Sequence, residues 1–244
     1  MNAILMEVFY MKKKNERGEK EQKCLDVARE CLGCINDWPQ ELFAVINLIM
    51  NVIENPQNND FPDFIGENGF IEHFEVTSSK TTNSGSKMKR EEAYFRNSDL
   101  QHIVYSKHSH EGFIESFKKI WQNHIDSLND KKIKANVGIF MVEYKDASMI
   151  VDIQKSQLYN RNQFIYPQDV IYTISKDKDL LNYIYDFRDK IQYVVFVNED
   201  WRFKINFCEL IDVNNIPKMV SEMCDVYVFS CNQIEGGKFT PVDI

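Results

Sequence analysis

The apolar run GIFMV at residues 138–142 constrains the fold most, because it follows directly after an amphipathic helical pattern. From Glu111 to Leu128, apolar residues recur at spacings of three and four, which predicts a helix with one buried face. Because GIFMV is continuously apolar, a buried strand is expected at Val137–Tyr144, which is typical of a sheet that is covered on both faces. Together they indicate helices layered on a sheet.

The rest of the chain alternates helical and strand patterns. Helices are expected at 19–34, from the N-cap Asp37 to about Asn55, at 178–190 and around Met219; strands are expected at 61–65, 70–77, 137–144, 170–174, 193–198, 203–207 and 226–229. This order favours an α/β sandwich around a mixed central sheet. We expect residues 1–37 to be an N-terminal helical elaboration, in which KKKNERGEKEQK is a solvated face or loop. Residues 38–244 would form one α/β domain whose C-terminal strands extend the sheet.

Composition narrows the classes of function. The 244 residues are 43% hydrophobic and 27% charged, which is ordinary for a globular protein, and the net charge of -8 opposes general adhesion to nucleic acid or anionic membranes. The sequence has no apolar run near 18 residues, no secretion signal and no GxGxxG, Walker or GxSxG motif. We therefore expect a cytoplasmic protein without a membrane partner, and neither a dinucleotide nor a P-loop site.

Acidic residues mark two neighbouring strands. Asp63 follows Pro62 at the entrance to the first strand, and Glu75 lies near the end of the second. Alternation along that second strand separates Glu72 from Glu75, because successive side chains point to opposite faces. We expect Glu72 to be an ordinary strand residue. Two carboxylates on adjacent strands make an oxygen-rich site that suits a hard divalent cation.

This arrangement resembles the PD-(D/E)XK nuclease superfamily over roughly residues 38–145. The resemblance rests on the helix, the Pro62-Asp63 strand, the strand ending at Glu75, the long helix and the next buried strand. It implies a restriction-endonuclease-like sandwich that hydrolyses phosphodiesters of nucleic acid, with DNA as the expected partner and a homodimer as one arrangement. It also implies that Asp63 and Glu75 bind magnesium, with manganese as the alternative, and that Glu41 on the first helix sometimes joins them.

The sequence departs from the family pattern at one catalytic position. Thr77 stands where the motif has lysine, and its hydroxyl can orient water but carries no positive charge. Lys80, in the polar loop that follows, is the expected substitute. Lys87, Lys89 and Arg90 in the same loop are candidates for phosphate contacts, although a solvated loop explains such a charge run equally well.

A second ExK string leaves an alternative open. Glu143-Tyr144-Lys145 fits the half-motif more literally than Glu75-Val76-Thr77, but no Pro-Asp strand precedes it directly. We prefer Asp63 with Glu75, because the elements then follow the family order. The alternative function is a catalytically degenerate nuclease fold that serves as a nucleic-acid-binding or protein-assembly module.

Histidines and cysteines supply further candidates. His73 shares the strand face of Glu75, and His108 and His110 are spaced to lie on one side of an extended segment; histidines in such places act as acid-base groups or metal ligands. Six cysteines without a secretion signal are expected to be reduced thiols. Cys31 and Cys34 form one CxxC, whereas a structural zinc site usually has two, so we expect buried thiols on a helix face.

Overall fold

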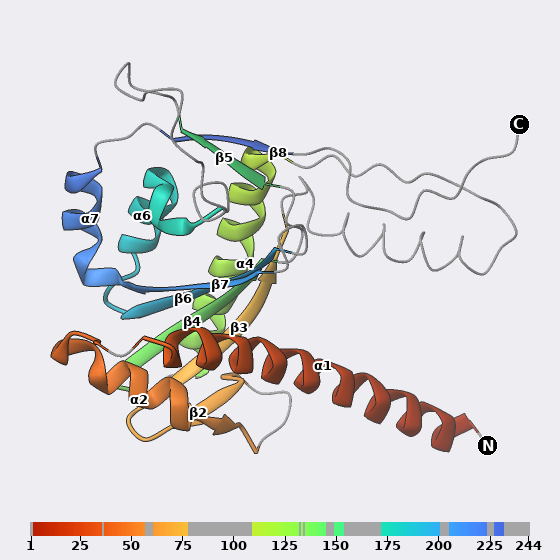
Figure 1. The fold of residues 1–244 in the computed structure, drawn as a ribbon. Coiled ribbons are helices and arrows are strands. Elements are labelled where there is room, and N and C mark those ends of the chain that lie inside the picture. Colours follow the sequence, from red (N-terminus) through yellow and green to blue (C-terminus); the bar gives the residue numbers. More distant parts are fainter. Residues whose placement is uncertain are drawn as a thin grey trace, which may run out of the picture.

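The protein is a three-layer α/β sandwich in the computed structural model, which describes residues 2–35, 37–56, 61–77, 109–131, 133, 135–144, 149–153, 172–200, 205–223 and 227–231. Helices α1 and α2 cover one face of the main sheet, and α4, α6 and α7 cover the other (Figure 1). None of the described helices is long and apolar enough to cross a lipid bilayer.

The described elements agree with an α/β class. The helices are α1 (Asn2–Gly33), α2 (Phe43–Asn51), α4 (His110–Lys131), α6 (Lys178–Tyr185) and α7 (Ile216–Glu222), with short 3-10 helices η1 (Gln40–Leu42), η2 (Ile174–Lys176) and η3 (Val213–Asn215). The strands are β1 (Ile53–Glu54), β2 (Phe64–Gly66), β3 (Gly69–Val76), β4 (Val137–Tyr144), β5 (Met149–Ile153), β6 (Tyr193–Asp200), β7 (Ile205–Asp212) and β8 (Tyr227–Cys231).

Six of the described strands form the main sheet, in the order β1-β2-β3-β4-β6-β7. Strands β1, β2 and β3 make an antiparallel meander, and α4 then carries the chain over to β4, which is parallel to β3. Strand β6 is parallel to β4, and β7 closes the described sheet antiparallel to β6. The sheet is therefore mixed, with its parallel strands at the centre.

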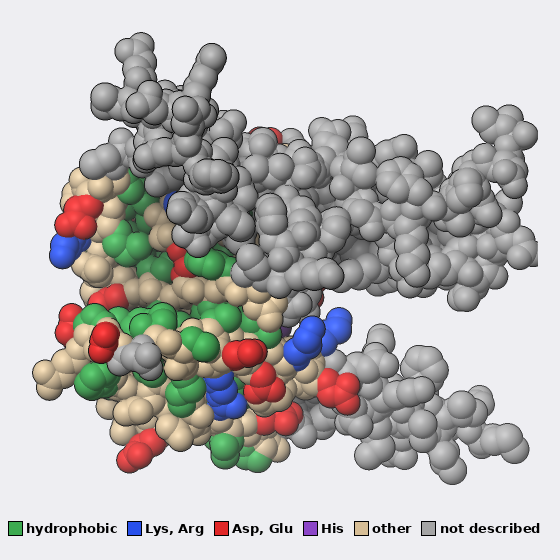
Figure 2. Space-filling model, in the orientation of Figure 1, with side chains coloured by type: hydrophobic (Ala, Val, Ile, Leu, Met, Phe, Trp, Pro, Cys, Tyr) green, Lys and Arg blue, Asp and Glu red, His purple; other side chains and the backbone are tan. Residues whose placement is uncertain are grey.

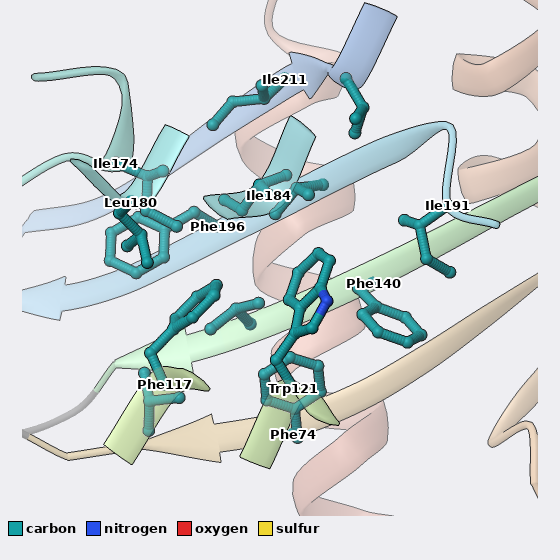
Figure 3. Packing of buried hydrophobic residues seen from close by; sticks show 14 of the residues in the cluster. Phe74, Phe117, Trp121, Phe140, Ile174, Leu180, Ile184, Ile191, Phe196 and Ile211 are labelled. Atoms are coloured by element: carbon teal, nitrogen blue, oxygen red, sulfur yellow. The ribbon is translucent and has the colours of Figure 1, made fainter. Parts of the chain in front are cut away.

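The central strands bury side chains on both faces, which explains why apolar residues predominate along them. On the α4 side, Phe74 and Phe140 pack against Trp121, whose ring stacks on Phe117 with centroids 5.3 Å apart (Figure 3). On the other side, residues of α1 and α2 cover the sheet. The buried members of this second cluster are Cys24, Leu25, Val27, Ala28, Leu32, Val45, Leu48, Ile49, Val52, Phe64, Ile71, Ile139, Met141, Val195 and Val197.

The β2–β3 hairpin lies close against α2. Asn68 takes a positive φ of 65°, which suits the tight turn between the two strands. A Cβ atom at Gly69 would lie 2.3 Å from the Leu48 Cδ2 atom and 2.8 Å from the Val137 carbonyl oxygen. Glycine at this position therefore allows the hairpin and the α2 layer to approach each other.

Several element boundaries differ from those expected. The charged segment after residue 11 is helical and belongs to α1, so the loop interpretation of it was wrong. The second helix ends at Asn51, because the chain turns into β1, where Ile53 is 63% exposed. The helix expected at 178–190 ends at Tyr185 and continues as turns.

Two expected strands also need correction. Of the strand expected at 170–174, the described part is extended at 172–173 and begins the 3-10 helix η2 at Ile174. The strand near 226–229 exists as β8, but it pairs with β5 in a separate two-stranded sheet and does not extend the main one. Among the strands that the structure describes, β7 is the one near the C-terminus that extends the main sheet.

Candidate metal centre

The Pro62-Asp63 segment is held in place by hydrogen bonds from three sides. Asn55 donates its side-chain amide to the Pro62 carbonyl at 2.9 Å and its backbone N–H to the Asp63 carbonyl at 2.8 Å. The Asp63 N–H donates to Glu72 Oε2 at 3.0 Å, while Asp63 Oδ2 accepts the backbone N–H of His73 at 2.9 Å. The Asp63 carboxylate is thereby fixed against the middle of β3.

Strand alternation divides the polar residues of β3 between two layers. Glu72, with Phe70, Phe74 and Val76, belongs to the side covered by α4. His73 lies on the side covered by α1, with Ile71. The expected separation of the two faces is thus confirmed for the described strand.

The first group that can hold a metal ion combines Glu21, Asp63 and His73. One ligand atom from each of these residues lies within 4.8 Å of the other two. Glu21 comes from α1, Asp63 from the entrance to β2, and His73 from β3. Two carboxylates and one imidazole fit Mn²⁺ or Zn²⁺ better than Mg²⁺, which prefers oxygen ligands alone.

The second group combines Cys24, His73 and Glu143, again with ligand atoms within 4.8 Å of one another. All three are buried, with exposures of 0%, 7% and 1%. His73 Nε2 lies 3.0 Å from Glu143 Oε2, within hydrogen-bond distance. His73 belongs to both groups, so it is the centre of the constellation.

The preferred carboxylate Glu75 lies next to the rival Glu143. The two are register partners on the parallel strands β3 and β4, so their backbones are neighbours at the carboxyl ends of these strands. Glu75 is half-buried and belongs to neither metal-ligating group of the described residues. The structure therefore brings Asp63 together with His73 and Glu21, and Glu143 together with His73 and Cys24.

The other expected site residues fall in different places. Thr77 directly follows β3 and is half-buried, and Glu41 is exposed on η1, outside both groups. Five expected or alternative basic residues and one histidine lie outside the described residues. They are Lys80, Lys87, Lys89, Arg90, Lys145 and His108.

Glu72 is buried and joins two layers, which strand alternation alone does not indicate. Its Oε2 atom accepts the Asp63 N–H, and its Oε1 atom lies 2.7 Å from Nδ1 of His124 on α4. The His124 ring stacks on Phe74 with centroids 4.7 Å apart. Glu72 therefore ties the entrance of β2 to helix α4.

A separate polar network surrounds Asp177, the N-cap of α6. Asp177 Oδ2 accepts the Tyr172 hydroxyl at 2.8 Å and lies 2.6 Å from His110 Nε2, while Oδ1 accepts the Leu180 N–H at 3.1 Å. Burial, followed by the nearby Asp177 carboxylate, raises the pKa of Tyr172 well above its usual value. This network explains His110 as a residue that joins α4 to α6.

The CxxC cysteines belong to no metal-ligating group of the described residues. Cys34 is exposed, and the Cys31 thiol is half-buried and lies 3.7 Å from the Asn206 carbonyl of β7. Burial raises the pKa of Cys31 and of Cys208, so both thiols are protonated at neutral pH.

A depression of about 600 Å³ lies beside the β2–β3 hairpin, between its turn and the Phe61-Pro62 segment. Asn55, Pro62, Gly69 and Lys131 contribute to its lining, and no side chain of either metal-ligating group does. On the face drawn in Figure 2, acidic side chains of the described residues are interspersed with basic ones over the α1 layer. Of the two metal-ligating groups, Cys24, His73 and Glu143 are all buried between α1 and the sheet, whereas Glu21 and Asp63 are half-buried.

Sequence reasoning missed Glu21 and Cys24 as partners of the site. Both lie on α1, three residues apart and hence on one helix face. The apolar stripe Leu25, Ala28 and Leu32 predicts which face of this helix is buried. Extending that stripe by one helical turn leads to Glu21, so the sequence contained a signal that Glu21 lies on the buried face of the helix.

Comparisons with protein-family models, with curated proteins and with solved structures gave no match.

Proposed function

We propose that this protein hydrolyses phosphodiester bonds of nucleic acid with the help of a divalent metal ion, on a restriction-endonuclease-like sandwich. The observation that carries the proposal is the position of Asp63, whose carboxylate shares a metal-ligating group with His73 and Glu21. The order of elements adds support, since α2, the meander β1–β3, the crossover α4 and the parallel strand β4 follow the arrangement that the Pro-Asp resemblance implies.

Asp63, His73 and Glu21 would hold the metal ion. Such an ion, when bound, activates water and stabilises negative charge on the phosphate. The donor set points to Mn²⁺ as the working ion rather than the magnesium expected from the resemblance. The backbone N–H of His73 and the side chain of Asn55 keep Asp63 oriented, so the carboxylate is positioned before any ligand arrives.

The remaining roles belong to residues that follow His73 in the sequence. The Thr77 hydroxyl would orient a water molecule, and Lys80 would supply the charge that threonine lacks. Lys87, Lys89 and Arg90 would contact the phosphate backbone of DNA, which makes binding weaker as salt increases. Glu75 would add a further carboxylate near the end of β3, where it is the register partner of Glu143 on the adjacent strand.

The test is cleavage of plasmid and single-stranded DNA with Mn²⁺ or Mg²⁺ by the wild type, Asp63→Asn and His73→Gln. Loss of a direct metal ligand should lower the rate at least about 100-fold, because even outer partners of metal sites cost 10- to 100-fold. Glu67→Gln is the matched control, since Glu67 is exposed in the turn of the same hairpin. Cleavage that survives in Asp63→Asn contradicts the proposal.

A catalytically degenerate module is the second candidate, and two observations favour it. His73 and Glu143 are buried against each other, and Thr77 stands in place of the catalytic lysine. If calorimetry detects no binding of Mn²⁺ or Mg²⁺ and the wild type cuts no DNA, the fold serves binding or assembly. Retention of labelled DNA by the uncut protein then separates a nucleic-acid module from a protein-assembly module.

A further inference from the structure

We infer that Cys24, His73 and Glu143 form a zinc site that fastens helix α1 to the centre of the sheet. The other group, Glu21, Asp63 and His73, is called the outer group here and shares only its histidine with this inner site. The inner site does not depend on nuclease activity. Its three ligands come from three separate elements, α1, β3 and β4, so one ion would join the N-terminal helix to two core strands.

The burial of these groups supports the site. Ionised carboxylates are costly to bury unless an opposite charge accompanies them, and a thiolate ligand is an anion as well. A Zn²⁺ ion with one thiolate, one carboxylate and one neutral imidazole is electrically neutral as a unit. Cys24 belongs to the buried apolar cluster of this layer, together with Leu25, Met141 and Val197. A buried apolar layer accommodates the electrically neutral zinc complex better than it accommodates the separate charges of its ligands.

The chemistry of the donors selects the metal. Sulfur and imidazole are preferred ligands of Zn²⁺ and poor ligands of Mg²⁺, and a zinc ion with three protein ligands completes its tetrahedron with a water molecule. Donors around one tetrahedral zinc ion are about 3.5 Å apart, given zinc–donor distances of 2.0 to 2.3 Å. The ligand atoms here already lie within 4.8 Å of one another. Small side-chain adjustments would complete the coordination.

The shared histidine links this site to the outer group. One imidazole nitrogen cannot serve two ions at once, so a zinc ion in the inner site that uses His73 Nε2 leaves only the Nδ1 nitrogen for the outer group. The variants that affect the two groups are nevertheless separate, because Cys24 and Glu143 belong only to the inner group and Asp63 only to the outer one.

Cobalt binding to the full chain tests the inference directly. The protein is stripped with a chelator under reducing conditions and titrated with Co²⁺ alone, while thiolate-to-cobalt charge-transfer absorption is recorded, and Zn²⁺ is then added as competitor. We expect one equivalent to produce the thiolate band and Zn²⁺ to abolish it. Cys24→Ala should lose the band and weaken Zn²⁺ binding at least about 100-fold.

The controls separate this site from other thiols and from the proposed nuclease. Cys34→Ala, at an exposed cysteine near the same helix, should keep the band. Asp63→Asn should also keep it while losing cleavage, so either proposal can fail without the other. Glu143→Gln is a second variant, which should bind Zn²⁺ more weakly while its circular dichroism spectrum shows that it still folds. A band that persists in Cys24→Ala, or a wild type that binds no Co²⁺, overturns the inference.

Discussion

His73 of β3 and Glu143 of β4 lie 3.0 Å apart, and both side chains are almost completely buried. In parallel register His73 faces Met141, so the pair is formed diagonally, two residues further along β4. The contact crosses the strands at the centre of the sheet and brings the residues of both metal-ligating groups into one polar cluster.

Breaking this pair should be costly in the metal-free protein. Glu143→Ala is expected to lower the free energy of unfolding by about 3–5 kcal/mol, because it leaves a buried imidazole without its carboxylate. His73→Ala should cost a similar amount. The double variant should lose less than the sum of the two, since neither partner remains uncompensated. Urea unfolding in the presence of a chelator measures all three values, and simple additivity would show that the two residues do not interact.

Glu72 should matter for stability rather than for metal binding. Glu72→Ala removes the acceptor of the Asp63 N–H and the partner of His124, and should cost about 2–3 kcal/mol. Glu72→Gln keeps one acceptor oxygen and should cost less. Urea unfolding of both variants checks this, with Glu67→Ala in the exposed turn as a control expected to change little. Equal losses for Ala and Gln would contradict the bridging role.

The aromatic core allows a matched pair of truncations. Phe140 is fully buried against Trp121 and Phe74, and Phe140→Ala should lower the free energy of unfolding by about 3–5 kcal/mol. Phe43, at the start of α2, is 52% exposed, so Phe43→Ala should cost far less. Thermal or urea unfolding distinguishes the two, and a comparable loss in both would mean that the Phe43 face is covered in solution.

Glu209 should make stability depend on pH in the direction opposite to an ion-paired carboxylate. Burial raises the pKa of Glu209, although hydrogen bonds from Ser175 act against this. A carboxyl group with a raised folded-state pKa contributes most below its unfolded value of about 4.3, and that contribution is lost as pH rises through the folded value.

Glu209→Gln lacks this titration, so its stability relative to wild type should increase between about pH 4 and pH 7. Urea unfolding at several pH values measures the difference. Glu222→Gln, at an exposed carboxylate of α7, is the control. If the difference in the free energy of unfolding between wild type and Glu209→Gln stays constant across this pH range, the expected dependence is contradicted.

Local sequence patterns were sufficient to predict the helix and the strand at the centre of the fold. The stripe from Phe113 to Leu128 and the apolar strand Val137–Tyr144 are each determined by burial along their own length, and both elements lie where the pattern predicts. Ile53 was assigned to a helix because it continues the apolar spacing, yet tertiary pairing with Ile65 draws it into β1. Hydrophobic periodicity does not distinguish these outcomes at the end of an element.

The candidate site was less predictable, because it joins residues that are distant in sequence. Asp63 and His73 lie in one hairpin and were both identified from the sequence, although their relation through the His73 N–H was not. Glu143 had been weighed as a rival to Glu75, whereas parallel pairing makes the two neighbours. Glu21 and Cys24 enter through the packing of α1, which depends on the whole sheet.

Helix α1 ends near residue 33, but its Cys31 thiol contacts the Asn206 carbonyl on β7, 175 residues later in the chain. During synthesis the helix therefore leaves the ribosome long before this edge of its docking surface exists. Until β7 has been made, apolar residues such as Leu25 and Leu32 lack part of their cover, and such surfaces attract chaperones or aggregate. The yield of folded protein should thus depend on how quickly the last strand of the main sheet is translated.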